Sequence, residues 1–207
     1  MELEEKKKKL SQLRQEISKC QKCPLAKNRT RTVPGEGNPN AEIIFIGEAP
    51  GFNEDREGVP FCGNAGKFLD ELLASIDMKR ENVFIANTLK CRPPENRDPQ
   101  PIEKEACRPY LDQQIEIIAA KIIITLGKHA TETFLPGVGG ITKLRAKLFR
   151  RPGNRYFFPL YHPAAALHNG SLRDTLIQDF NNIPEALKKI EAEAKPALAK
   201  KENLRLF

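Results

Sequence analysis

Polar side chains that could do chemistry come directly after three apolar runs of this chain. They are Glu48 after the run 43–46, Asn87 after 83–86 and His162 after 156–161. Short β-rich runs predict buried strands, and ligands of open α/β sheets bind just beyond the carboxyl ends of the strands. Alone, each residue has an ordinary explanation as a loop carboxylate, a turn former or a core imidazole. As a set they indicate a pocket.

An aromatic residue adds a flat surface to this set. Phe61 lies between Pro60 and a glycine-rich loop, without the periodic apolar neighbours of a core position. It could provide a stacking surface, although filling a local gap in the core is a fair alternative. A carboxylate, an amide, an imidazole and an aromatic ring suit a flat heterocycle with carbonyl and N–H edges, such as a nucleobase.

Four of the five cysteines form a second group. Cys20 and Cys23 make a Cys-x2-Cys pair, Cys91 follows a predicted strand end, and Cys107 lies on the next predicted helix. Four thiolates could hold zinc or a [4Fe-4S] cluster, and the 15 residues between the second two do not match a usual zinc ribbon. The spacing leaves the metal open, with unrelated free thiols as the alternative. We assign Cys62 to packing in the pocket loop.

Strands that alternate with helices must position these residues. The apolar runs and the helical periodicity between them predict a parallel sheet covered by helices on both faces. Pro159 indicates that the last strand lies at an edge or ends irregularly, and Pro184 should break or kink the helical stretch 171–195. We expect one domain over residues 1–195 and a polar tail over 196–207 whose composition is compatible with disorder.

Composition sets broad limits on function. The chain has 207 residues, a net charge of +7 and 40% apolar residues, which is typical of a globular protein. No long apolar segment or secretory signal is present, so we expect a cytoplasmic protein that makes no membrane contact. The basic excess permits binding to a polyanion, with an inert basic surface as the alternative.

Four ordered motifs resemble those of the family 4 uracil-DNA glycosylases, the iron–sulfur type known from thermophilic bacteria and archaea. They are Gly-Glu-Ala-Pro-Gly at 47–51, Gly-x-Pro-Phe-x-Gly-x-x-Gly at 58–66, Asn-x-x-Lys-Cys-Arg-Pro-Pro-x-Asn-Arg at 87–97 and His-Pro-Ala-Ala-Ala-Leu at 162–167. The resemblance covers roughly residues 10–185. It implies a three-layer α/β/α sandwich with a central four-stranded parallel sheet. It also implies hydrolysis of the N-glycosidic bond of uracil in DNA, the first step of base-excision repair.

The resemblance also implies roles for individual residues. Phe61 would stack on uracil, Asn87 would read its O4 and N3 edge, and His162 would face O2. The pocket wall would be Gly47, Glu48 and Ala49, and the cluster ligands would be Cys20, Cys23, Cys91 and Cys107. Better-known members of the superfamily carry an aspartate at the position of Ala49, so another carboxylate must orient the water. Glu48 is the first candidate for that catalytic role and Glu54 the second.

Contacts to DNA are expected from basic loops and from the segment after the His-Pro motif. The expected residues are Arg29, Arg31, Lys90, Arg92 and Arg97, with Leu167, His168 and Asn169 as a wedge beside the flipped base. The end of the chain faintly resembles a sliding-clamp-binding peptide through Leu204 and Phe207. An ordinary tail is the better interpretation. We expect the protein to be a monomer. The alternatives are a glycosylase for hypoxanthine or mismatched thymine, a non-catalytic binder of altered bases, and a zinc-binding nucleotide hydrolase.

Overall fold

A six-stranded sheet forms the centre of the computed structural model, which describes residues 1–203 and their side chains as far as residue 194. Four strands are parallel and lie side by side in the order β3-β2-β4-β6. Their bounds are Phe84–Asn87 for β3, Ile43–Gly47 for β2, Ile122–Leu126 for β4 and Arg155–Leu160 for β6. Two short strands, Glu36–Gly37 (β1) and Phe149–Arg151 (β5), add antiparallel edges beside β3 and β6.

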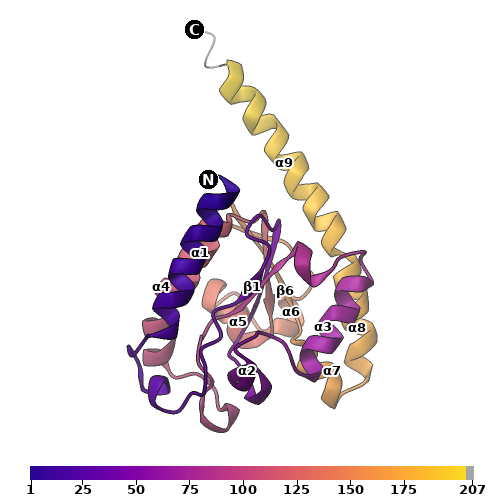
Figure 1. The fold of residues 1–207 in the computed structure, drawn as a ribbon. Helices are drawn as coiled ribbons and strands as arrows, with labels where there is room; N and C mark the ends of the chain where they lie inside the picture. The colour runs from indigo at the N-terminus through magenta and orange to yellow at the C-terminus, as the bar shows by residue number, and fades with distance from the viewer. Residues whose placement is uncertain (204–207) are drawn as a thin grey trace.

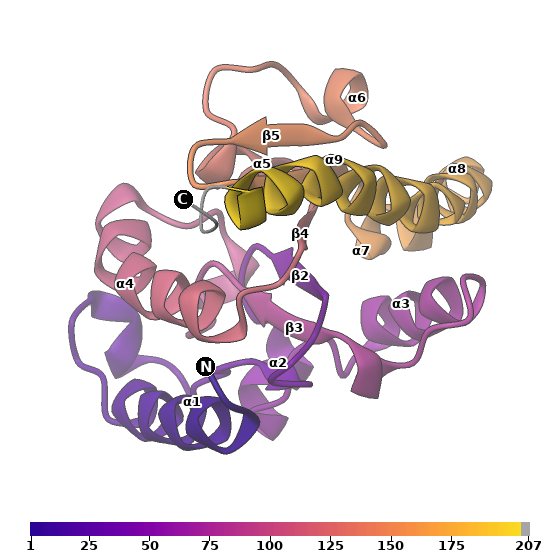
Figure 2. The same ribbon diagram turned by 90° about the horizontal axis from the view of Figure 1, so that it is seen from above.

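Helices cover both faces of the sheet, so the predicted three-layer α/β/α arrangement is confirmed (Figures 1 and 2). On one side lie α1 (Leu3–Ser18) and α4 (Pro101–Ile118). On the other lie α3 (Asn64–Ala74), α8 (Ser171–Asn181) and α9 (Ile183–Asn203). The short helices are α2 (Phe52–Glu57), α5 (Lys128–Phe134), α6 (Ile141–Leu144) and α7 (Pro163–His168), and the 3-10 turns are Pro24–Lys27, Arg80–Asn82 and Pro94–Asn96.

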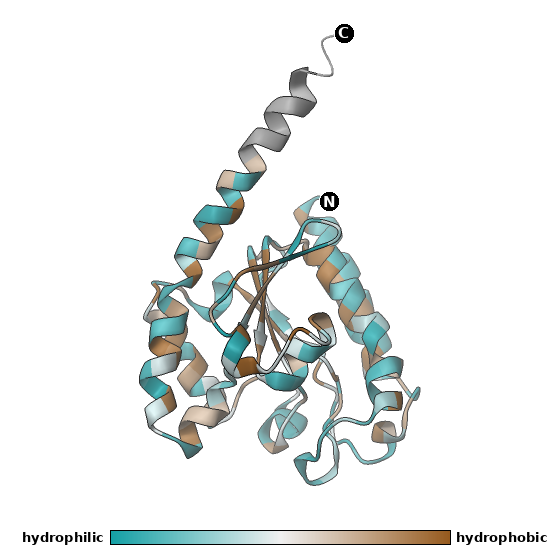
Figure 3. Ribbon diagram, turned by 180° about the vertical axis from the view of Figure 1, so that it is seen from behind, coloured by the Kyte–Doolittle hydropathy of each residue, from teal (hydrophilic) through white to brown (hydrophobic). Residues whose placement is uncertain are grey.

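The alternation of side chains along each strand divides the core between the two faces. In β2, Ile43 and Phe45 pack towards α3 and α8, and the Phe45 ring stacks on Phe180 with centroids 5.7 Å apart. The alternate residues Ile44 and Ile46 pack towards α4 and α5. Because both faces are buried, the strands are apolar throughout, and Figure 3 shows them as a brown centre among helices with teal outer faces. The site must therefore lie at an end of the sheet.

The structure extends the predicted four-stranded sheet by two edge strands. Both were missed because β1 has two residues and β5 has three, which is too short for an alternating pattern. Pro159 lies within β6 beyond the last residue that pairs with β5, and its carbonyl accepts a hydrogen bond from the Ala146 amide. The predicted edge position is wrong, because β6 lies between β4 and β5. Pairing with β5 stops at Phe157, so no ladder bond to β5 needs the N–H that Pro159 lacks.

The C-terminal part of the chain is helical as far as the structure describes it. The predicted helical stretch is interrupted at Asn182, between the end of α8 and the start of α9 at Ile183. The interruption expected from Pro184 is therefore confirmed. Helix α9 continues to Asn203, through most of the stretch expected to be a polar tail. Leu204 and Phe207 of the clamp-like peptide lie outside the described residues. Within the described part of the chain, no helix is both long and apolar enough to cross a membrane.

Candidate functional site

A cavity of about 310 Å³ opens at the carboxyl ends of the parallel strands. The sheet register explains its position, because Gly47 at the end of β2 pairs with Asn87 at the end of β3, and His162 follows β6 by two residues. The lining residues are Glu48, Ala49, Pro50, Gly51, Glu54, Phe61, Ala65, Asn87, Pro93, Asn96, Arg97, His162 and Ala164. The polar residues singled out in the sequence therefore meet in one pocket.

The Asn87 amide is the deepest polar group of this pocket. Its side chain is 2% exposed, and Oδ1 has no hydrogen-bond partner within the described structure. A buried amide oxygen left unpaired costs about 1–3 kcal/mol, so this position is suited to a ligand that donates a hydrogen bond. Gly47 makes room for it, since a Cβ at this glycine would overlap Asn87 Oδ1 and lie 2.8 Å from Cζ of Phe61.

The Phe61 ring forms a wall of the pocket beside His162. The two ring centroids are 5.3 Å apart, with an angle of 26° between the planes. Phe61 has a φ of 51°, a left-handed conformation that costs a residue other than glycine on the order of 1 kcal/mol. A Cβ on Gly66 would overlap the Phe61 carbonyl, so the glycine at 66 is what allows the loop to hold the ring in this orientation.

His162 enters the pocket as a neutral imidazole with a defined tautomer. Its Nδ1 accepts a hydrogen bond from the Ala164 amide at 3.1 Å, in the first turn of α7. A neutral ring whose Nδ1 accepts carries its proton on Nε2. Burial lowers the pKa of His162 to about 4, against the smaller opposing effect of the Glu54 charge. The ring therefore offers an N–H donor near neutral pH without being a cation.

We expect acid to destabilise the protein through His162. The folded pKa is about 4 and the unfolded value about 6.5, so between these values the unfolded chain binds a proton that the folded chain does not. The contribution of His162 to the free energy of unfolding is complete above about pH 6.5 and decreases as the pH falls towards 4. Urea unfolding across this range should show a shallower loss in His162→Gln, and equal losses in the two proteins would contradict the assignment.

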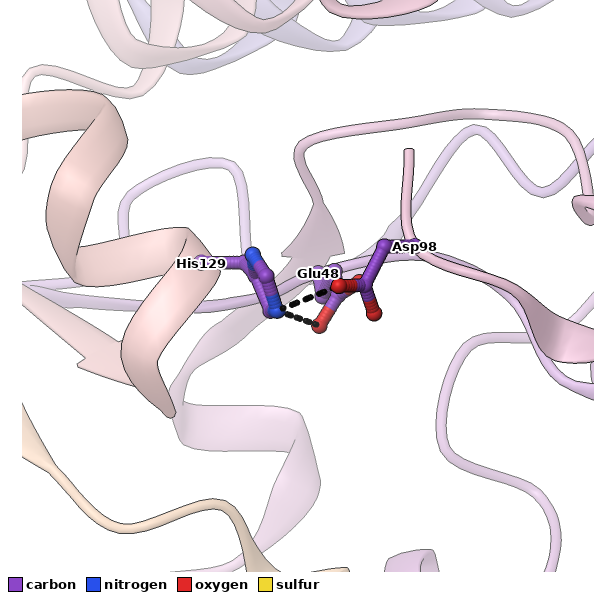
Figure 4. A group of neighbouring side chains, drawn as sticks. All are labelled: Glu48, Asp98 and His129. Carbon is purple, nitrogen blue, oxygen red and sulfur yellow. Dashed lines mark ion pairs between the residues drawn. The ribbon is translucent and has the colours of Figure 1, made fainter. Parts of the chain in front are cut away.

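Glu48 lies at the rim of the pocket beside two residues that the sequence analysis did not select. Its Oε2 is 3.9 Å from Nε2 of His129, and Oδ2 of Asp98 is 3.5 Å from the same nitrogen (Figure 4). Partial burial raises the pKa of Glu48, and His129 opposes this. One ligand atom from each residue lies within 4.8 Å of the others, so the three could hold a divalent cation. Contacts of the ring nitrogen with the two carboxylates account for the same arrangement without a metal ion.

Glu54 is bound to the backbone of the loops around the pocket. Its Oε2 accepts from the Gly51 amide at 3.0 Å, and its Oε1 accepts from the amides of Cys62 and Gly63 at 3.1 and 3.2 Å. These bonds join the loop after β2 to the loop that carries Phe61. The geometry suits a carboxylate that positions two loops, and it leaves Glu48 as the better candidate for holding a water molecule.

The residues expected to contact DNA divide into two groups. Arg31, Leu167, His168 and Asn169 are exposed, and Arg92 and Arg97 are partly exposed, with Arg97 at the pocket and paired to Glu103. The prediction for Lys90 is wrong: the side chain is 1% exposed, and its ammonium donates to the Asn87 carbonyl at 2.9 Å and to Gln114 Oε1 at 2.6 Å. Arg29 is directed inwards, donating to the Cys91 sulfur at 3.3 Å and to the Cys20 carbonyl at 2.7 Å.

We expect Lys90→Met to lower the free energy of unfolding by about 3 kcal/mol, because two buried oxygens lose their charged donor. Lys67→Met, at an exposed position of α3, is the matched control and should change stability by less than about 0.5 kcal/mol. Urea unfolding of both variants measures the difference. A loss below about 1 kcal/mol in Lys90→Met would show that the buried ammonium does not hold this segment.

The four cysteines of the second group line one small cavity between α1, α4 and the segment after β3. The Lys90 amide donates to the Cys107 sulfur at 3.2 Å, and Arg29 donates to Cys91. Burial raises the pKa of Cys107 to about 11, so a thiolate here requires a cationic partner. Four cysteines around one cavity are a ligand set that fits a metal group bound by thiolates.

Comparison with known proteins agrees with this geometry. Residues 34–187 match the model of the uracil DNA glycosylase superfamily. A type-4 uracil-DNA glycosylase of Sulfurisphaera tokodaii is 50% identical over 85% of this chain and 84% of its own length. A protein of the same name from Saccharolobus solfataricus is 52% identical over 83% of this chain and 83% of its own length. Another, from Thermotoga maritima, is 43% identical over 84% of this chain and 92% of its own length. The chain therefore belongs to the uracil-DNA glycosylase superfamily, in the type-4 family of these relatives.

Proposed function

We propose that this protein is a uracil-DNA glycosylase, which hydrolyses the N-glycosidic bond of a flipped-out uracil and leaves an abasic site in DNA. The unpaired Asn87 oxygen, buried in a pocket beside the neutral His162 ring, is the observation that carries this proposal. The names of the type-4 relatives support it. The activity belongs to base-excision repair, as the first step.

Asn87 is the proposed reader of the base. Its Oδ1 accepts from the N3–H of uracil, and its Nδ2 donates to O4. Cytosine has an amino group where uracil has O4, so the Asn87 Nδ2–H would face another donor. Cytosine also has no proton on N3, so the bond to Oδ1 is lost as well. A site built to make such bonds rejects the wrong partner by a large factor, because buried polar groups are then left unpaired.

The leaving base is the proposed target of His162. As the glycosidic bond breaks, the sugar gains oxocarbenium character and negative charge grows on uracil O2. The Nε2–H of a neutral imidazole stabilises that charge by a hydrogen bond, in an effect worth about 3 kcal/mol. The low pKa of His162 means that the ring acts as a donor and not as an acid. Phe61, beside it, provides the surface against which the flat base lies.

The attacking water is assigned to Glu48, with Glu54 as the residue that holds the surrounding loops. Glu48 lines the pocket next to Ala49, which supports the proposal that its carboxylate directs a water molecule at the sugar. Its raised pKa, caused by partial burial, makes it a stronger base than an exposed carboxylate. Glu54 uses both oxygens on backbone amides, so we assign it a positioning role.

Binding of DNA is assigned to the basic and exposed residues around the pocket. These are Arg31, Arg92 and Arg97, with Leu167, His168 and Asn169 on the segment that ends α7. Flipping the base costs a few kcal/mol, and side chains that enter the gap offset part of that cost. Leu167 is 48% exposed and is the apolar residue of this segment.

A [4Fe-4S] cluster is the proposed occupant of the cysteine site, with Cys20, Cys23, Cys91 and Cys107 as ligands. The resemblance of the motifs to the iron–sulfur type of glycosylase supports this assignment, and so does the position of all four cysteines around one cavity. The cluster would supply a structural crosslink between α1, α4 and the segment that follows Asn87. It takes no part in the hydrolysis.

Single-turnover cleavage of a labelled oligonucleotide with one uracil tests the function, with alkali to convert abasic sites into strand breaks. We expect breaks that require uracil and a decrease of about 10²-fold to 10³-fold in the rate of His162→Ala. Lys8→Ala, at an exposed position of α1 outside the pocket and the proposed DNA surface, is the control and should keep the rate of the parent. If the folded protein leaves uracil in place but excises hypoxanthine or mismatched thymine, that base and not uracil is the substrate. If it binds DNA but excises no base, the proposed catalysis is refuted.

A further inference from the structure

An exposed aromatic ring lies directly outside the pocket. Phe52, the first residue of α2, is 55% exposed, which is unusual for a ring of this size unless a partner covers it. The guanidinium of Arg92 lies 5.2 Å from the ring centroid and that of Arg56 lies 5.8 Å away. We refer to Phe52, Arg56 and Arg92 as the outer platform.

The outer platform is continuous with the pocket. Gly51, which precedes Phe52, lines the pocket, and so does Pro93, which follows Arg92. Arg92 also donates through Nε to Asn96 Oδ1 at 2.7 Å, and Asn96 is a further lining residue. A strand that delivers one nucleotide into the pocket therefore has a neighbouring nucleotide at the platform.

The chemistry of the outer platform fits a nucleotide. Two arginines, Arg56 and Arg92, lie beside the ring. Among the acidic residues of α2, Glu54 and Asp55 accept from backbone amides, and Glu57 lies 3.9 Å from Arg56. An exposed aromatic face flanked by guanidinium groups combines a stacking surface for a base with cations for the adjoining phosphates. The charge does not suit a basic or purely apolar partner.

We propose that Phe52 stacks on an unpaired base next to the flipped nucleotide, while Arg56 and Arg92 contact the phosphates on either side of it. The proposal rests on the proposed function, because it places a DNA strand across the pocket. It assigns the platform to a base that has lost its pairing partner, so it concerns single-stranded DNA or the opened part of a duplex.

The absence of tryptophan from this chain gives the test a direct signal. Phe52→Trp places a single indole on the platform, and stacking on a base should quench its emission when a uracil-free single strand with a stable abasic analogue is added. Leu3→Trp, which is partly exposed at the start of α1 and away from the pocket end, is the matched control and should not respond (Figure 1). Fluorescence anisotropy of the labelled strand shows independently that DNA is bound.

A second variant measures how much the contact contributes. Phe52→Ala should weaken binding of the single strand about tenfold, whereas Phe52→Trp should bind as the parent chain does. Unchanged indole emission with DNA bound, or an unchanged affinity of Phe52→Ala, would overturn the proposal. Failure to excise uracil would instead refute the proposed function, and the two results are separate because the binding strand contains no uracil.

Discussion

Replacing Asn87 with aspartate should abolish most of the uracil-excising activity while the fold is retained. The two side chains have the same shape, but aspartate has no N–H to donate and brings a negative charge towards the carbonyl edge of uracil. Both the lost bond and the buried charge oppose the base in the transition state. We expect the single-turnover rate to fall by about 10³-fold or more, which corresponds to about 4 kcal/mol.

The matched control for Asn87→Asp is Asn53→Asp, which adds the same charge at an exposed position of α2. It should retain activity within a few-fold, which separates the loss of base reading from general repulsion of DNA. Urea unfolding of both variants checks that the fold is intact. An Asn87→Asp protein with nearly normal uracil excision would show that Asn87 does not read the base.

Removing the sulfur of Cys91 should cost both stability and base recognition. Cys91 follows Asn87 by four residues, and the segment between them is bound to the pocket loop through the Thr88 amide on the Gly47 carbonyl and the Leu89 amide on the Glu48 carbonyl. The free energy of metal binding adds to that of folding when a site forms only in the folded state. For Cys91→Ala we expect loss of iron and a fall of at least about 10 °C in Tm.

The fifth cysteine provides the control for this prediction. Cys62→Ala lies in the pocket loop, outside the cavity that the other four line, and should keep its iron content and a Tm within a few degrees of the parent. Iron analysis and visible absorbance measure the iron content, thermal unfolding gives the Tm, and single-turnover excision of uracil measures base recognition. A stable Cys91→Ala protein with full activity would refute the proposed link between the cysteine site and Asn87, the proposed reader of uracil.

The positions of the strands and of the main pocket residues could be predicted because local rules fix both. A run such as 43–46, apolar on both faces, has few alternatives to a buried parallel strand, and parallel strands bring their carboxyl ends to one edge. Glu48, Asn87 and His162 meet there for that reason. His129 follows the same rule less closely, because it comes three residues after the end of β4.

The burial of Lys90 and the inward direction of Arg29 could not be predicted, because the sequence shows charge but not its direction. A lysine in a loop is usually solvated, and nothing local shows that Gln114 and the Asn87 carbonyl will surround this one. Those partners become neighbours only when α4 packs beside the loop. The carboxylate that fixes the loops, Glu54, was identified as a residue of interest, but its three backbone bonds depend on the tertiary fold.

The way in which β3 presents Asn87 has a chemical consequence for the lifetime of the protein. Asparagine loses its amide nitrogen when the backbone nitrogen of the next residue attacks the side-chain carbonyl, a reaction that requires a mobile backbone and that limits asparagine at high temperature. Here that nitrogen belongs to Thr88, and its N–H is bonded to the Gly47 carbonyl at 2.9 Å. The hydrogen bond on Thr88 therefore protects Asn87 from deamidation. Deamidation would produce an aspartate at position 87, the change that we expect to abolish most of the activity. Uracil, the base that this protein is proposed to remove, is itself the product of the deamination of cytosine.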